Sequence, residues 1–160
     1  MQSIIKTRTI LFFIFILSLL TCCSKNENSS GLVQVKYGTS FGECIGYCKK
    51  DLTLKPGSVS YKRYGWTETI EPITFTDILE ENKWDLIKEK LDIASFSALP
   101  TTIGCPDCAD GGAEWIEIEL ANGEMHKVTF EYYNEPNAVK NIISELREKM
   151  NGFENRTGNK

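Results

Sequence analysis

The first 24 residues divide this chain into a segment that does not fold and a segment that does. Lys6 and Arg8 form a short basic start, and the apolar run from Ile10 to Leu20 is broken only by Ser18. A basic start, a short apolar core and small residues after it are typical of an export signal, which takes no part in the fold. The apolar run is too short to cross a membrane, since a spanning helix needs roughly 20 apolar residues.

Two cysteines, Cys22 and Cys23, follow the apolar run and change the kind of signal that the sequence predicts. A bacterial lipoprotein signal places a small residue directly before the lipidated cysteine and an aliphatic residue three positions before it. Leu20 and Cys22 meet this pattern for Cys23, whereas lipidation of Cys22 would put β-branched Thr21 in the small position. We therefore predict a lipoprotein signal peptide over residues 1–22 and a lipid on Cys23. The alternative is a plain secretory signal.

Lipidation of Cys23 predicts a chain that is anchored to the bacterial cell envelope. Each acyl methylene buried in the bilayer contributes roughly 0.8 kcal/mol, so two or three chains hold firmly. The run from Leu19 to Lys25 resembles the signals of Bacteroidota lipoproteins and favours the outer membrane. Residues 23–31 are mostly polar and are expected to form a linker between the lipid and the domain.

The rest of the chain is long enough for one ordinary domain with a core and too short for two. The full chain carries a net charge of −4, and no basic stripe runs along it. An acidic chain of this kind argues against nucleic acid as a partner. We expect a single domain over residues 32–152 and a flexible tail over residues 153–160.

Alternating apolar residues predict strands at the start of this domain. Residues 32–37 form the first expected strand, and residues 51–54 and 59–63 form a hairpin around Lys55-Pro56-Gly57-Ser58. In a type II turn, proline presets the first central residue and glycine accepts the positive φ of the second. A helix capped by Asn82 is expected next, because apolar residues recur on one of its faces: Trp84, Ile87 and Leu91.

The second half of the domain repeats the order of a strand pair and a helix. Residues 114–120 and 125–133 are expected strands, and Asn122-Gly123 between them is a strong signal for a tight hairpin. A final helix with one apolar stripe is expected to stop at Gly152; the stripe is Val139, Ile142, Ile143, Leu146 and Met150. This order predicts an α+β fold, with helices packed on one face of an antiparallel sheet of two hairpin blocks.

Four cysteines lie in the predicted domain: Cys44, Cys48, Cys105 and Cys108. An exported chain meets an oxidising compartment, so structural disulfides are expected. Their connectivity stays open, since four cysteines allow three pairings. Zinc held by all four is an alternative, because two close cysteine pairs far apart in sequence are a usual ligand layout. The Cys-Pro-Asp-Cys motif also allows thiol-redox chemistry, although two glycines and a strand follow it rather than a helix.

No catalytic constellation accompanies these cysteines in the sequence. The single histidine, His126, is expected to be structural or at the surface, since the chain has no Gly-x-Ser-x-Gly elbow. Asp107, Asp110 and Glu114 miss the spacing of a calcium loop, so a solvated acidic loop is expected there. Trp115 faces away from the isoleucines of its strand, and is expected either at the rim of the core or on a partner surface.

Short motifs in this domain resemble those of a known family. Phe41-Gly42-x-Cys44-x-x-Tyr47 and Leu99-Pro100-Thr101-Thr102 are similar to motifs of an uncharacterised lipoprotein domain family that is widespread in Bacteroidota. Members of that family carry a Cys-Phe-Gly-x-Cys-Pro-x-Tyr loop, then a hairpin, a helix, a second hairpin and a final helix. The likeness spans roughly residues 32–150, and implies the fold without an assigned activity.

This chain departs from the family's loop at a few positions. Ser40 stands in place of the family's first cysteine and Ile45 in place of its proline, while Cys48 and the Cys-Pro-Asp-Cys loop are additions. The family-like loop favours a local Cys44–Cys48 bridge, which would leave Cys105 to pair with Cys108.

These features predict a non-catalytic lipoprotein of the cell envelope that acts as a disulfide-stiffened binding or structural module. Its expected partners are the membrane, through the lipid anchor, and an envelope protein; no cofactor or metal is expected. The alternative is a thiol-redox or zinc-binding protein that uses Cys44, Cys48, Cys105 and Cys108. A count of free thiols in the exported protein separates the two hypotheses.

Overall fold

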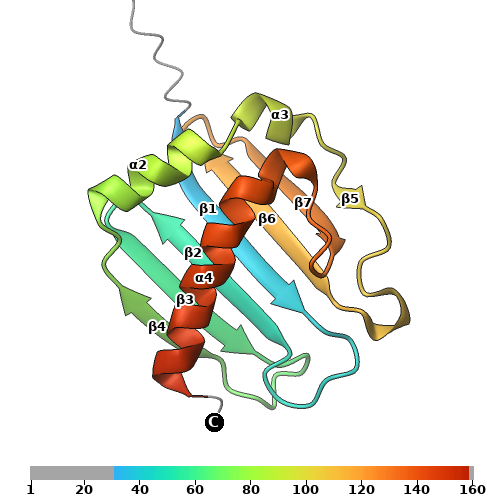
Figure 1. The fold of residues 1–160 in the computed structure, drawn as a ribbon. Helices are drawn as coiled ribbons and strands as arrows, with labels where there is room; N and C mark the ends of the chain where they lie inside the picture. The colour runs from blue at the N-terminus through green and yellow to red at the C-terminus, as the bar shows by residue number, and fades with distance from the viewer. Residues whose placement is uncertain (1–30, 159–160) are drawn as a thin grey trace, which may run out of the picture.

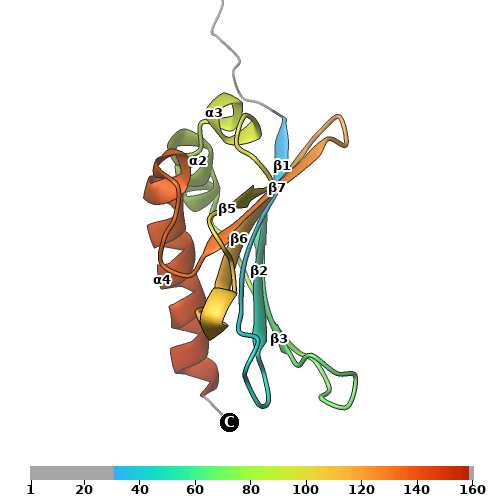
Figure 2. The same cartoon turned by 90° about the vertical axis from the view of Figure 1, so that its right-hand side faces the viewer.

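The computed structural model describes residues 31–158 of the chain. The predicted signal peptide, the lipidation site at Cys23 and the linker as far as Ser30 lie outside the described residues. The described part is an α+β fold with one seven-stranded sheet (Figure 1). Figure 2 shows the helices on a single face of this sheet, as the sequence predicts.

The central strand, β1 (Leu32–Ser40), separates the sheet into two halves. One half is a meander of consecutive antiparallel strands: β2 (Lys49–Lys55), β3 (Ser58–Tyr64) and β4 (Ile73–Asp77). The other half follows β1 in the spatial order β6 (Ala113–Leu120), β7 (Met125–Glu131) and β5 (Thr102–Ile103). The sheet therefore places the two predicted hairpins on opposite sides of β1.

Both predicted hairpin turns are confirmed. β2 and β3 pair with Leu54 opposite Val59, and Gly57 has a φ of 78° between them. In the β6–β7 hairpin the Gly123 N–H donates to the Leu120 carbonyl at 2.8 Å, and Gly123 has a φ of 83°. Glycine occupies these positions because residues with a β-carbon rarely adopt such angles.

One strand pair contradicts the prediction of a wholly antiparallel sheet. β5 pairs with β7 in parallel, with Thr102 opposite Thr129 and Ile103 opposite Phe130. A strand of two residues is too short to show the period-two alternation by which a strand is recognised in a sequence. The pairing therefore comes from the tertiary fold, which lays this segment along the edge of β7.

Within residues 31–158, three α-helices cover the sheet: α2 (Glu81–Lys90), α3 (Ile93–Ser97) and α4 (Lys140–Thr157). α2 begins earlier than predicted, because its N-cap is Glu80, whose carbonyl accepts the Trp84 N–H at 3.1 Å. The predicted cap, Asn82, therefore lies within the first turn. A single 3-10 turn, η1 (Cys108–Asp110), lies in the loop before β6, and another, η2 (Asn137–Val139), comes directly before α4.

The predicted stop of the last helix at Gly152 is wrong. α4 continues to Thr157 and ends at Gly158, which has a φ of 69°. Residues 153–157, predicted as part of a flexible tail, thus belong to the helix. Phe153 explains the extension, because its ring is buried and stacks on Tyr61 with centroids 5.6 Å apart. This burial outweighs the cost of a helical glycine, which is about 1 kcal/mol relative to alanine.

The core fills the space between the sheet and the helices. Alternate residues of the strands point into it, and the helices meet them with their apolar stripes. Its fully buried members include Tyr37, Leu52, Ile116, Ile118, Val128, Phe130, Phe96, Ile142, Ile143 and Leu146. The periodicities predicted for β6, β7 and α4 therefore identify the buried faces correctly.

We predict that Phe153→Ala destabilises the domain by about 3–5 kcal/mol, because it removes a buried aromatic ring. Denaturant melts measure this change. The control Asn155→Ala alters an exposed residue of the same turn and should change the free energy of unfolding by about 0.5 kcal/mol or less. Equal stability of the two variants would show that the last turns of α4 do not pack on the sheet.

Candidate functional site

Three loops meet at one end of the sheet (Figure 1). They cover residues 41–48 after β1, residues 65–72 between β3 and β4, and residues 104–112 between β5 and β6. We call these three loops together the loop end. Two of them carry the four cysteines that the sequence singles out, so the fold brings both cysteine motifs to the same region.

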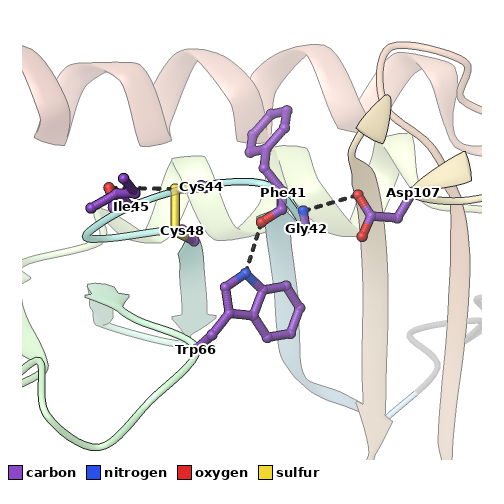
Figure 3. The surroundings of a disulfide bond; sticks show 7 residues. All are labelled: Phe41, Gly42, Cys44, Ile45, Cys48, Trp66 and Asp107. Carbon is purple, nitrogen blue, oxygen red and sulfur yellow. Dashed lines mark hydrogen bonds between the residues drawn. A yellow bond between two sulfur atoms is a disulfide. The ribbon is translucent and has the colours of Figure 1, made fainter. Parts of the chain in front are cut away.

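Hydrogen bonds join the three loops to one another (Figure 3). The Trp66 indole N–H donates to the Phe41 carbonyl at 2.8 Å, which ties the second loop to the first. The Gly42 N–H donates to the Asp107 carboxylate at 3.1 Å, which ties the third loop to the first. Asp107 was predicted to lie in a solvated acidic loop, but its carboxylate instead cross-links two loops.

The structure pairs the cysteines locally within each loop. Cys44 bonds to Cys48 and Cys105 bonds to Cys108, with 5.5 Å between the Cα atoms in both pairs. This separation is in the usual range for a disulfide. It is also the pairing that the family resemblance favours, although the oxidation of these cysteines in the envelope stays a prediction.

The four cysteines do not form one cluster. Among residues 31–158, no group of three or more His, Cys, Asp or Glu side chains could hold a metal ion. The two loops meet through Gly42 and Asp107 rather than through sulfur atoms. In this arrangement each motif closes its own loop.

The disulfide in the first loop leaves a large apolar side chain fully exposed. Ile45 lies between Cys44 and Cys48 and is completely accessible to solvent, as Figure 3 shows at the tip of the loop. Trp66 of the neighbouring loop is 48% exposed even though its indole N–H is bonded. The loop end therefore presents apolar surface on a backbone that a covalent bond and interloop hydrogen bonds hold in place.

A buried ionic network lies beside the loop end, and the sequence analysis did not identify it. Glu114 has no exposed surface, and its carboxylate accepts from the Tyr37 hydroxyl at 2.7 Å and from Arg147 Nε at 2.9 Å. Arg147 also bonds to Glu135 at 2.6 Å. Glu114 lies two residues before Ile116 on the same face of β6, so the strand alternation could have placed it inside.

The pKa shifts in this network favour a fixed charge state. Burial raises the pKa of Tyr37, and the neighbouring charge of Glu114 raises it further. The hydrogen bond from Arg147 lowers the pKa of Glu135. Tyr37 therefore stays protonated while Arg147 and Glu135 stay charged. The network joins β1, β6 and α4, which suits a structural role better than proton transfer.

The other two residues considered in the sequence do not belong to the loop end. His126 places a ring nitrogen 3.1 Å from the Leu99 carbonyl and packs edge-on against Phe96, so its role is structural. Trp115 lies half-buried on the sheet face opposite the helices. Its ring covers Gly38, where a β-carbon would come within 2.1 Å of a ring atom, and Lys127 lies 4.7 Å from the ring centroid.

Comparisons of the sequence with protein-family models and with curated proteins gave no match. Within the part of the chain that the structure describes, no helix is long and apolar enough to cross a membrane.

We predict that none of the four domain cysteines has a free thiol in non-reduced protein recovered from the envelope. The Cys44→Ser, Cys48→Ser double variant should lose about 2 kcal/mol of stability, the chain-entropy value for a loop this short. Thiol alkylation with mass spectrometry and denaturant melts measure the two effects. Four alkylatable thiols together with stoichiometric zinc would contradict the prediction and favour the metal hypothesis.

Proposed function

We propose that this chain is a non-catalytic lipoprotein of the bacterial cell envelope, anchored through Cys23 in the outer membrane. In this proposal it belongs to the Bacteroidota domain family that its motifs resemble, and it binds an envelope protein through the loop end. The basic start, the short apolar run and the cysteines after it support the anchor. The structural character of the Glu114 network and of His126 supports a role without catalysis.

One observation carries the binding role: Ile45 is fully exposed on a loop that is closed by a disulfide. Exposed apolar side chains cost little singly, but the fully exposed Ile45 and the half-exposed Trp66 both belong to the loop end. A loop held by covalent and hydrogen bonds loses little conformational entropy on binding, which favours affinity. Ile45 is therefore well placed to act as an anchor residue that inserts into an apolar recess of a partner protein.

Thiol-redox chemistry receives less support from the same geometry. Cys105 and Cys108 are both exposed, as a reactive pair must be. Cys108 begins only a three-residue 3-10 turn, and Asp107 before it has a φ of 62°. A thiol at this position does not lie at the N-terminus of an α-helix, where the helix dipole would stabilise a thiolate.

We predict that Cys23→Ala releases the protein from the membrane, because it removes the acylated side chain. Detergent partitioning and labelling with an acyl-chain precursor measure the loss. Cys22→Ala is the matched control and should leave both the label and the membrane fraction unchanged. Retention of label in the Cys23 variant and its loss in the Cys22 variant would place the lipid on Cys22.

We also predict that Ile45→Glu abolishes binding of the partner protein, because a carboxylate cannot enter an apolar recess without a large desolvation cost. Affinity capture from intact cells that produce the lipidated protein measures which proteins are retained. Ile78→Glu is the matched control, since Ile78 is 75% exposed and follows β4 at the other end of the sheet.

The proposal requires a protein that is retained by the original chain and by the Ile78 variant but lost with the Ile45 variant. Both variants should keep the stability of the original chain in denaturant melts, because both side chains are exposed. A protein captured equally by all three forms would show that the loop end is not the binding surface.

A further inference from the structure

The two disulfides differ in how far solvent reaches them. Cys48 is only 3% exposed, so the Cys44–Cys48 bridge is covered on one side. Cys105 and Cys108 are both exposed at the surface of the third loop. Thiol–disulfide exchange requires a thiolate to reach a disulfide sulfur, so an exposed bridge reacts more readily than a covered one. The Cys105–Cys108 bridge is therefore the one that a reductant reaches first.

The loop around this exposed bridge holds its backbone in an unfavourable conformation. Among residues 31–158, four residues other than glycine have a positive φ, and three of them lie in this loop: Asp107 at 62°, Ala109 at 50° and Asp110 at 58°. The left-handed conformation is unfavourable for a residue with a β-carbon, and aspartate tolerates it better than alanine. Such strain persists only where the surrounding contacts hold the backbone in place.

The ends of this loop are attached to β7 or to the residue after it, whereas Cys108 depends on the bridge. At one end the Cys105 N–H donates to the Glu131 carboxylate at 2.9 Å. At the other end the Gly112 carbonyl accepts the Tyr132 N–H at 3.3 Å. Among the described residues, the backbone hydrogen bonds of Cys108 join it only to its own loop. Breaking the disulfide therefore frees the segment around Cys108 while both ends of the loop stay attached.

Asp107 lies inside the segment that the bridge closes, and it connects this segment to the first loop. Its carboxylate accepts the Gly42 N–H at 3.1 Å (Figure 3). A β-carbon at Gly42 would come within 2.7 Å of the same carboxylate, so the two groups are in close contact. Gly42 belongs to the loop that carries Ile45. The backbone conformation that the bridge imposes on Asp107 therefore maintains the hydrogen bond between the two loops.

We propose that the Cys105–Cys108 disulfide is a site of reversible reduction by a dithiol, and that its reduction releases Asp107 from Gly42. A thiolate of the dithiol attacks one sulfur of the bridge and forms a mixed disulfide, and the other cysteine leaves as a thiolate that takes up a proton. The second thiol of the dithiol then loses its proton and displaces the first cysteine, which also takes up a proton. The protein gains two electrons and two protons, and the dithiol becomes a disulfide.

This exchange requires less of the two cysteines than catalysis would. The attacking thiolate belongs to the dithiol, so neither Cys105 nor Cys108 needs a helix N-terminus to lower the pKa of its thiol. The covered Cys44–Cys48 bridge stays oxidised and keeps the first loop closed, so reduction loosens the attachment of this loop without opening it. The exchange does not depend on the partner proposed for Ile45.

Reduction of the mature chain with dithiothreitol, followed by alkylation and peptide mapping, tests the proposal. Cys105 and Cys108 should become alkylated at least about tenfold faster than Cys44 and Cys48, because the second bridge is exposed and the first is covered. The first bridge is thus an internal control in the same molecule. Equal rates for the two bridges, or faster reduction of Cys44–Cys48, would overturn the proposal.

Deuterium exchange at the Gly42 amide tests the release of the first loop. After selective reduction the Gly42 N–H should exchange at least about fivefold faster, because it loses its acceptor. The Cys105→Ser, Cys108→Ser double variant lacks the bridge and should show the same fast exchange without dithiothreitol. A Gly42 amide whose exchange is unchanged by reduction would overturn the proposal.

Two single variants test whether Asp107 is the link between the loops. Asp107→Ala should give fast Gly42 exchange even in the oxidised protein, and reduction should then add nothing further. Asp110→Ala is the matched control, because Asp110 has a similar φ of 58° and does not bond to Gly42, so exchange should stay slow until the bridge is reduced. Slow exchange in oxidised Asp107→Ala would overturn the proposal.

Discussion

The packing of α4 across the sheet is the interaction on which the rest of the structure depends. Its apolar stripe buries five side chains: Ile142, Ile143, Leu146, Met150 and Phe153. Arg147 lies on the same helix and reaches the buried carboxylate of Glu114 on β6. Removing one partner of a buried ion pair costs about 3–5 kcal/mol, so this contact fixes which turn of α4 lies over β6.

The same contact connects the core to the loop end through a chain of aromatic rings. Arg147 lies 4.4 Å from the ring centroid of Tyr133, Tyr133 packs on Tyr132, and Tyr132 packs on Phe41. Phe41 belongs to the loop that carries Cys44 and Cys48, and its carbonyl accepts the hydrogen bond from the Trp66 indole N–H. The position of Ile45 therefore rests on the disulfide and on the packing of α4 together.

Much of the candidate site could be predicted from residue types, but not its assembly. The sequence indicated the cysteine loops, the hairpins and the buried stripe of α4, because each is encoded by a local pattern. It could not show that Asp107 bonds to Gly42, since those residues are 65 positions apart and no periodicity relates them. Glu114 was expected in a solvated acidic loop, and only its distant partners Tyr37 and Arg147 make its burial favourable.

The sequence by itself determined the α+β class and the turn chemistry of both hairpins, and it predicts an export signal. The tertiary structure alone decided the parallel β5–β7 pair and the extension of α4 beyond Gly152. The difference has one physical cause. Local patterns reflect the preferences of neighbouring residues for one backbone conformation, whereas these features depend on free energy gained from residues far along the chain. Gly152 favours a helix end in isolation, and the burial of Phe153 against Tyr61 reverses that preference.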